Sequence, residues 1–100
     1  MITIHVRIGL DTDTMREVLA EPIGELFGIH RTIGGSGWTL THLPSGLAAA
    51  MRDDRSALRL IASRLITACQ LVDWLNTDRA YYVGVKDICS KAIRDCGAVV

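Results

Sequence analysis

The segment from Ser56 to Leu75 constrains the fold of this chain more than any other. Its apolar residues recur at helical spacing and its polar residues occupy the opposite side, which predicts one amphipathic helix with Asp53 or Asp54 as the N-cap. At 1.5 Å per residue such a helix is about 30 Å long, enough to cover a small antiparallel sheet. The predicted stripe comprises Leu58, Ile61, Leu65, Ala68, Cys69, Val72 and Leu75.

The strands expected under this helix have two-residue alternation and glycine-rich or proline-containing connections. The loop Gly34–Gly37 predicts a hairpin in which Ile33 lies opposite Trp38. That pairing places Phe27 and Ile29 on a core face, and it leaves four polar residues, His30, Thr32, Thr39 and Thr41, on the other face. The predicted strands are Met1–Ile8, Glu25–Ile33, Trp38–Leu43 and Leu47–Met51.

Two shorter helices complete the predicted fold. Thr14 and Glu17 have the spacing of a capping box, so the segment Asp11–Pro22 is predicted to contain a short helix that ends at Pro22. The stretch 80–85 is predicted to be extended or loop-like, and Val85–Cys96 a C-terminal helix. The whole chain, 1–100, is therefore expected to be a single α+β domain: an antiparallel sheet of three to four strands covered by a long helix, with a short N-terminal helix and a C-terminal helix.

Charge and cysteine usage narrow the functional classes. The formal net charge is +0, so no long-range field draws the chain to nucleic acid or an anionic membrane. The three cysteines lack CxxC spacing and no signal segment precedes them, which indicates a reducing cytoplasm. Arg59, Arg64 and Asp73 interrupt the apolar stretch Leu58–Leu75, so it is not expected to span a membrane.

His42 admits two interpretations. With Ser45 nearby it could act in nucleophilic catalysis, or its ring could pack in the core. No recognisable nucleophile motif accompanies it, and packing is favoured. The histidines and cysteines also lack the close pairs of a zinc site, so neither a catalytic residue, a metal nor a cofactor is expected.

Binding surfaces are predicted on both layers. The exposed arginines of the helix and the second face of the sheet are candidate partner-binding positions: His30, Thr32, Thr39, Thr41, Arg52, Arg55, Arg59 and Arg64. The alternative is that the stretch Arg52–Arg64 binds nucleic acid as a small regulator. A wide apolar stripe on the helix predicts a homodimer interface at Leu60, Leu71 and Trp74.

The stretch W-T-L-T-H-L-P-S-G-L-A, followed by an alanine-bearing helix that ends near Asp73 and Trp74, resembles small phage and prophage proteins over Gly37–Trp74. Small size, neutral charge and a sheet-plus-helix pattern also resemble phage anti-CRISPR proteins. This resemblance implies a non-enzymatic inhibitor in the host cytoplasm that binds a host defence complex (CRISPR-Cas) or nuclease and blocks it sterically. It implies no residue roles.

Overall fold

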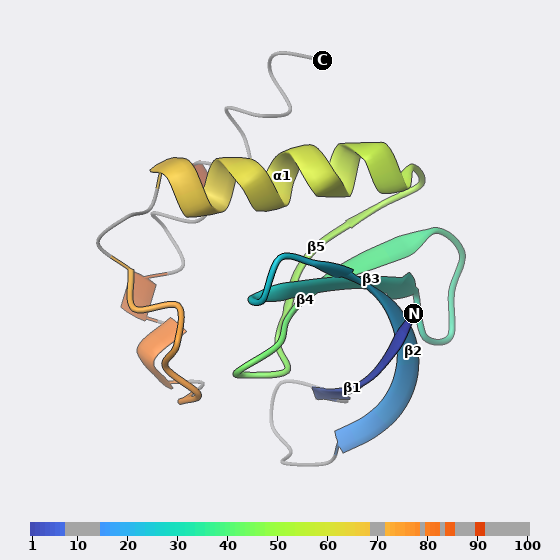
Figure 1. Cartoon of the computed structure of the whole chain (residues 1–100), viewed down its shortest axis with the longest axis horizontal. Helices are drawn as coiled ribbons and strands as arrows, with labels where there is room; N and C mark the ends of the chain where they lie inside the picture. The colour runs from blue at the N-terminus through green and yellow to red at the C-terminus, as the bar shows by residue number, and fades with distance from the viewer. Residues whose placement is uncertain (8–14, 69–71, 79, 83, 86–89, 92–100) are drawn as a thin grey trace.

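The computed structural model describes residues 1–7, 15–68, 72–78, 80–82, 84–85 and 90–91. Five antiparallel strands follow one another in the spatial order β1-β2-β3-β4-β5, and helix α1 packs on one side of them (Figure 1). The α+β class is confirmed, with five strands instead of three to four. The elements are β1 (Ile2–Arg7), β2 (Met15–Ile23), β3 (Phe27–Arg31), β4 (Trp38–His42), β5 (Ala48–Arg52) and α1 (Arg55–Ala68).

Strand β2 replaces the predicted N-terminal helix, and that prediction is wrong. A helix of two turns has little stability by itself, whereas β1 has a buried face and needs a partner strand. β2 pairs with all six residues of β1. Val18 and Ala20 turn inward while Leu19 is 65% exposed, which is strand alternation. Pro22 lies beyond the pairing with β1, where its missing N–H removes no bond to that strand.

The hairpin of β3 and β4 is confirmed, but its register is not the predicted one. Arg31 lies opposite Trp38, and Phe27 lies opposite His42. The Thr32 N–H donates to the Gly37 carbonyl at 3.2 Å, so the loop begins at Thr32 and takes in Ile33. Because side chains alternate with a period of two, this shift of two residues leaves the predicted faces unchanged.

Helix α1 covers the first face of β3 and β4 and forms the larger core with it. The rings and branched side chains that meet there are completely or almost completely buried, and their burial supplies the main favourable term in folding. This core contains Phe27, Ile29, Leu40, Leu58, Ile61, Ala62, Leu65 and Val72.

The helix is shorter than the predicted Ser56–Leu75. Residues 72–78 are not helical, because hydrogen bonds hold them in turns. The Leu75 N–H donates to the Asp73 carboxylate at 3.3 Å and the Asn76 N–H donates to the Asp73 carbonyl at 3.1 Å. These bonds, and the packing of Trp74 on Phe27, turn the chain back towards the sheet.

The second face of β3 and β4 is covered in part by the β1–β2 hairpin, which curls beneath it (Figure 1). Ile4, Val6 and Ala20 form a smaller core there. A Cβ atom placed on Gly28 would lie 3.3 Å from the Ala20 Cβ and 3.4 Å from the Ile4 Cδ1, so glycine permits this close approach. The β3–β4 hairpin is therefore packed on both faces.

Beyond the turns, residues 80–82 and 84–85 are helical, so the prediction of an extended stretch is wrong. The Ala80 N–H donates to the Asp78 carboxylate at 2.9 Å, which satisfies a donor at the start of this turn. Of the predicted C-terminal helix, Val85 and residues 90–91 are described and are helical; the rest of it, and all three cysteines, lie outside the described residues.

Candidate functional site

One group of side chains on the described surface combines exposed arginines with a tryptophan. Arg31 at the end of β3 and Arg55 at the start of α1 each place the guanidinium carbon 4.7 Å from the centre of the Trp38 ring. Arg52 lies opposite Trp38 on the other neighbouring strand. We call Arg31, Trp38, Arg52 and Arg55 the arginine–tryptophan surface. At this distance each guanidinium is attracted to the face of the indole.

Glu21 ties this surface to β2. Its carboxylate accepts two hydrogen bonds from Arg59, at 2.8 and 2.9 Å, and lies 3.7 Å from Arg55. The Arg59 hydrogen bonds and the charges of both arginines hold the pKa of Glu21 below its usual value of 4.5. Arg59 is therefore committed to a bidentate pair within the chain, whereas Arg31 makes no ion pair with a described residue.

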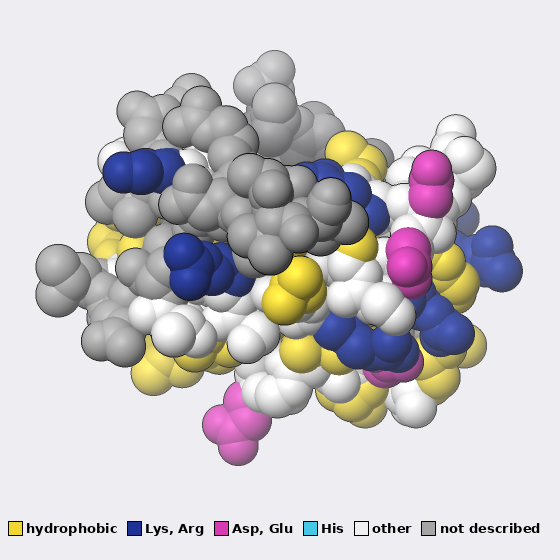
Figure 2. All heavy atoms as spheres, turned by 90° about the horizontal axis from the view of Figure 1, so that it is seen from above, with side chains coloured by type: hydrophobic (Ala, Val, Ile, Leu, Met, Phe, Trp, Pro, Cys, Tyr) yellow, Lys and Arg dark blue, Asp and Glu magenta, His cyan; other side chains and the backbone are white. Residues whose placement is uncertain are grey.

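The four predicted arginines differ in their surroundings. All are exposed, as expected for binding positions. Arg52 and Arg55 belong to the arginine–tryptophan surface, Arg59 pairs with Glu21, and Arg64 makes no ion pair with a described residue. Seen from the helix side, blue basic and magenta acidic groups lie side by side on the described part of this face (Figure 2).

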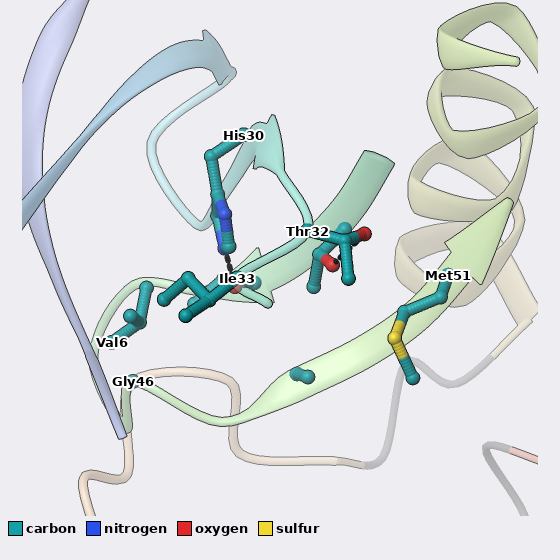
Figure 3. A pocket seen from close by; sticks show the side chains of 9 residues that line it. Val6, His30, Thr32, Ile33, Gly46 and Met51 are labelled. Carbon is teal, nitrogen blue, oxygen red and sulfur yellow. Dashed lines mark hydrogen bonds between the residues drawn. The ribbon is translucent and has the colours of Figure 1, made fainter. Parts of the chain in front are cut away.

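The four predicted sheet residues lie together, but in a hollow and not on an open face. His30, Thr39 and Thr41 are at most 5% exposed, and Thr32 is half-buried. They line a cavity of about 140 Å³ together with Val6, Ile33 and Met51. Figure 3 shows His30 and Thr32 at this cavity with Val6, Ile33 and Met51. Residues of the β1–β2 hairpin and of β5 line its sides. A flat partner surface cannot reach these buried side chains.

Polar atoms in the hollow are paired. The His30 Nδ1–H donates to the Arg31 carbonyl at 2.7 Å, so in the neutral ring Nε2 accepts from the Thr41 hydroxyl at 2.8 Å. The hydroxyls of Thr32 and Thr39 are 2.8 Å apart. The hollow therefore contains an imidazole whose two nitrogens are used and three hydroxyl oxygens.

His42, the other histidine of interest, is buried against the opposite face. Its Nε2–H donates to the Trp74 carbonyl at 2.6 Å and its Nδ1 accepts from the Ser45 hydroxyl at 2.8 Å. The ring packs on Phe27, Trp74 and Tyr82. Burial lowers the pKa of His42, with the Trp74 carbonyl opposing the shift in part, so the ring is held neutral.

The described surroundings of Ser45 and His42 differ from those of a catalytic dyad. Ser45 is 2% exposed, and its oxygen also accepts the Leu47 N–H at 3.2 Å. The group that orients the imidazole is a backbone carbonyl, whereas a catalytic triad uses a carboxylate. The described hydrogen-bond partners of His42 are Ser45, Trp74 and, at 3.4 Å from Nε2, the Tyr82 hydroxyl, and all belong to the folded chain.

Of the three residues predicted to form a dimer interface, the two that the structure describes, Leu60 and Trp74, differ in their surroundings. Leu60 is 49% exposed on α1, Trp74 packs inward against Phe27 and Tyr82, and Leu71 lies outside the described residues. The described part of the predicted stripe is thus divided between surface and core. Self-association stays a prediction.

Sequence reasoning missed Glu21, Arg31 and Trp38 as site residues. Glu21 was placed in a helix, and the pairing of Arg31 with Trp38 depends on a register that the pattern missed by two residues. The only local sequence feature that pointed to the arginine–tryptophan surface is a tryptophan, Trp38, next to a loop.

Among the described residues there is no group of three or more His, Cys, Asp or Glu placed to hold a metal, and no helix long and apolar enough to cross a membrane. Comparisons with protein families, with curated proteins and with solved structures find no significant match to this chain.

Proposed function

We propose that this protein is a non-enzymatic binding protein that holds a protein partner through the arginine–tryptophan surface, against carboxylate groups of that partner. The observation that carries the proposal is the placing of two guanidiniums, Arg31 and Arg55, each 4.7 Å from the centre of the Trp38 ring, at positions where both arginines are exposed.

Tryptophan and arginine are the residues most enriched among those that dominate binding energy at protein interfaces. A guanidinium stacked on an indole keeps its N–H groups at its edge, where they can meet a carboxylate in a bidentate pair. Because the stack already restricts the side chain, less conformational entropy is lost when the partner binds. Arg31 is the best placed of these groups, since it has no competing carboxylate among the described residues.

The alternative, a nucleic-acid-binding regulator, is supported less well. Glu21 engages Arg59 through two hydrogen bonds and lies near Arg55, so the stretch Arg52–Arg64 has less positive charge to offer than its sequence implies. Affinity for nucleic acid depends on the number of phosphates neutralised, and two or three available arginines give weak binding at physiological salt.

The buried state of Ser45, and the use of both His42 nitrogens inside the chain, support a role without catalysis. The narrower form of the proposal is that the partner is a host defence complex, such as a CRISPR-Cas effector or a nuclease, which this protein blocks by occupying its surface. That form depends on the resemblance to phage inhibitors alone.

The test compares Arg31→Glu with Arg64→Glu. Both variants replace one exposed arginine by glutamate, so their net charges are equal, but only Arg31 contacts Trp38. The tagged wild-type protein is used to capture proteins from host lysate, the captured protein is purified, and its Kd is measured for each form. Arg31→Glu should weaken binding about 30-fold or more, as expected for a dominant interface residue, and Arg64→Glu by less than about threefold.

Equal effects of the two substitutions, or the capture of no protein, would contradict the proposal. Capture that disappears after nuclease treatment, with an affinity that falls linearly against the logarithm of salt concentration, would instead establish the nucleic-acid alternative.

A further inference from the structure

We infer that the hollow on the second face of β3 and β4 is a binding site for a small uncharged ligand with one ring-sized apolar part and one hydroxyl group, such as a phenol. This site is separate from the arginine–tryptophan surface: neither Trp38 nor any of its three arginines lines the hollow (Figure 3).

The size of the hollow sets the size of the ligand. Its volume is about 140 Å³. A protein cavity of about 150 Å³ lined by apolar side chains binds benzene, so a single six-membered ring matches the available space.

The lining sets the charge of the ligand. Among the described residues, the nine that line the hollow include no carboxylate, ammonium or guanidinium group. Apolar contact comes from Val6, Ile33 and Met51, which belong to three different parts of the chain. A carboxylate or an amine placed among these groups would lose its hydration without a charged partner, and burying such a charge is costly.

The hydroxyls set the polar part of the ligand. In the pair formed by Thr32 and Thr39, one hydroxyl donates to the other, so one hydrogen of the pair has no acceptor among the described residues. The Thr41 hydroxyl donates to the His30 ring and keeps lone pairs that can accept. The hollow thus offers one donor and one acceptor to the hydroxyl group of a ligand.

The inference is tested with three probes of nearly equal size: phenol, benzene and benzoate. Binding to the full chain is followed by amide chemical shifts in ¹H–¹⁵N spectra. Phenol should bind saturably and shift the amides of Thr39 and Thr41, benzene should bind about fivefold to tenfold more weakly because it lacks the hydroxyl, and benzoate should not bind.

Two variants locate the binding. Ala48→Phe places a ring at an exposed β5 residue that lines the hollow, and it should abolish phenol binding. Thr39→Val keeps the shape but removes a hydroxyl, so it should weaken phenol about fivefold to tenfold and leave benzene unchanged. The spectrum of each free variant shows whether it is folded, and Ala48→Phe, at an exposed position, serves as the test if Thr39→Val is unfolded.

The inference fails if phenol causes no saturable shifts, if Ala48→Phe binds phenol as well as the wild type does, or if benzoate binds as tightly as phenol. None of these outcomes affects the proposed protein partner, because Arg31 and Trp38 are unchanged in both variants.

Discussion

Truncation of His42 to alanine tests whether this residue stabilises the fold. The substitution removes a buried ring that packs on three aromatic side chains, with ring centres 4.8 to 5.6 Å away. Replacing a large buried side chain by alanine costs about 2–5 kcal/mol. It also leaves the partly buried Trp74 carbonyl without its 2.6 Å donor, which costs at most about 1–3 kcal/mol, the cost of a fully buried unsatisfied group. Since these effects overlap, we expect a loss of about 3–5 kcal/mol in the free energy of unfolding.

The measurement is equilibrium unfolding in urea. With a slope of about 2 kcal/mol per molar urea, the midpoint of the His42→Ala variant should fall by about 2 M. His5→Ala is the matched control: the His5 side chain is 61% exposed and, among the described residues, its hydrogen bond is to Glu17, at 3.2 Å, so its removal should change stability by less than about 0.5 kcal/mol.

A His42→Ala variant as stable as His5→Ala would refute this reasoning. If such a stable variant also lost an enzymatic activity of the protein, the catalytic interpretation of His42 and Ser45 would replace the structural one.

Three further predictions concern pH and backbone strain. Because burial lowers the pKa of His42 in the folded state, the unfolded chain binds a proton first as pH falls below about 6.5. The free energy of unfolding should therefore decrease with falling pH, by at most about 1.4 kcal/mol per pH unit, until the folded-state pKa is reached. In urea unfolding, the His42→Phe variant should lack this pH-dependent component. The lowered pKa of Glu21 means that its ionised carboxylate stabilises the fold at pH values above 4.5, the usual pKa of this group. This contribution is lost as pH falls through the folded-state pKa. The Glu21→Gln variant should therefore lose less stability than the wild type between about pH 5 and 3. Gly37→Ala should destabilise more than Gly34→Ala, by about 1 kcal/mol or more in thermal unfolding, because both have positive φ but only at Gly37 would a Cβ lie 2.9 Å from a backbone oxygen; equal costs would contradict this.

The parts of the fold that sequence reasoning predicts correctly are those with a strong local pattern. The alternation of Ile4 and Val6 identifies β1, and the glycine-rich loop identifies the β3–β4 hairpin. In β2, by contrast, a local capping-box pattern competes with pairing to β1, and the pairing prevails because it completes a buried face. That outcome depends on residues distant in sequence, which a local pattern does not contain.

In the candidate sites, too, features with a local pattern are predictable and contacts between distant residues are not. Exposure of the helix arginines follows from their place opposite the apolar stripe, and the shared face of His30 and Thr41 follows from alternation. The link between Glu21 and Arg59 joins residues 38 positions apart. It forms only when α1 has packed on the sheet, so no spacing rule could reveal it.

Because β1 pairs only with β2 among the described strands and rests on the smaller of the two described cores, the amino-terminal hairpin is a weaker cooperative unit than the layer of β3, β4 and α1. Its amide hydrogens should exchange with solvent through partial opening, at a free energy below that of global unfolding. Such an opening removes Val6 from the wall of the hollow while the helix stays docked. The ligand site that we propose in the hollow would therefore open while the larger core stays folded.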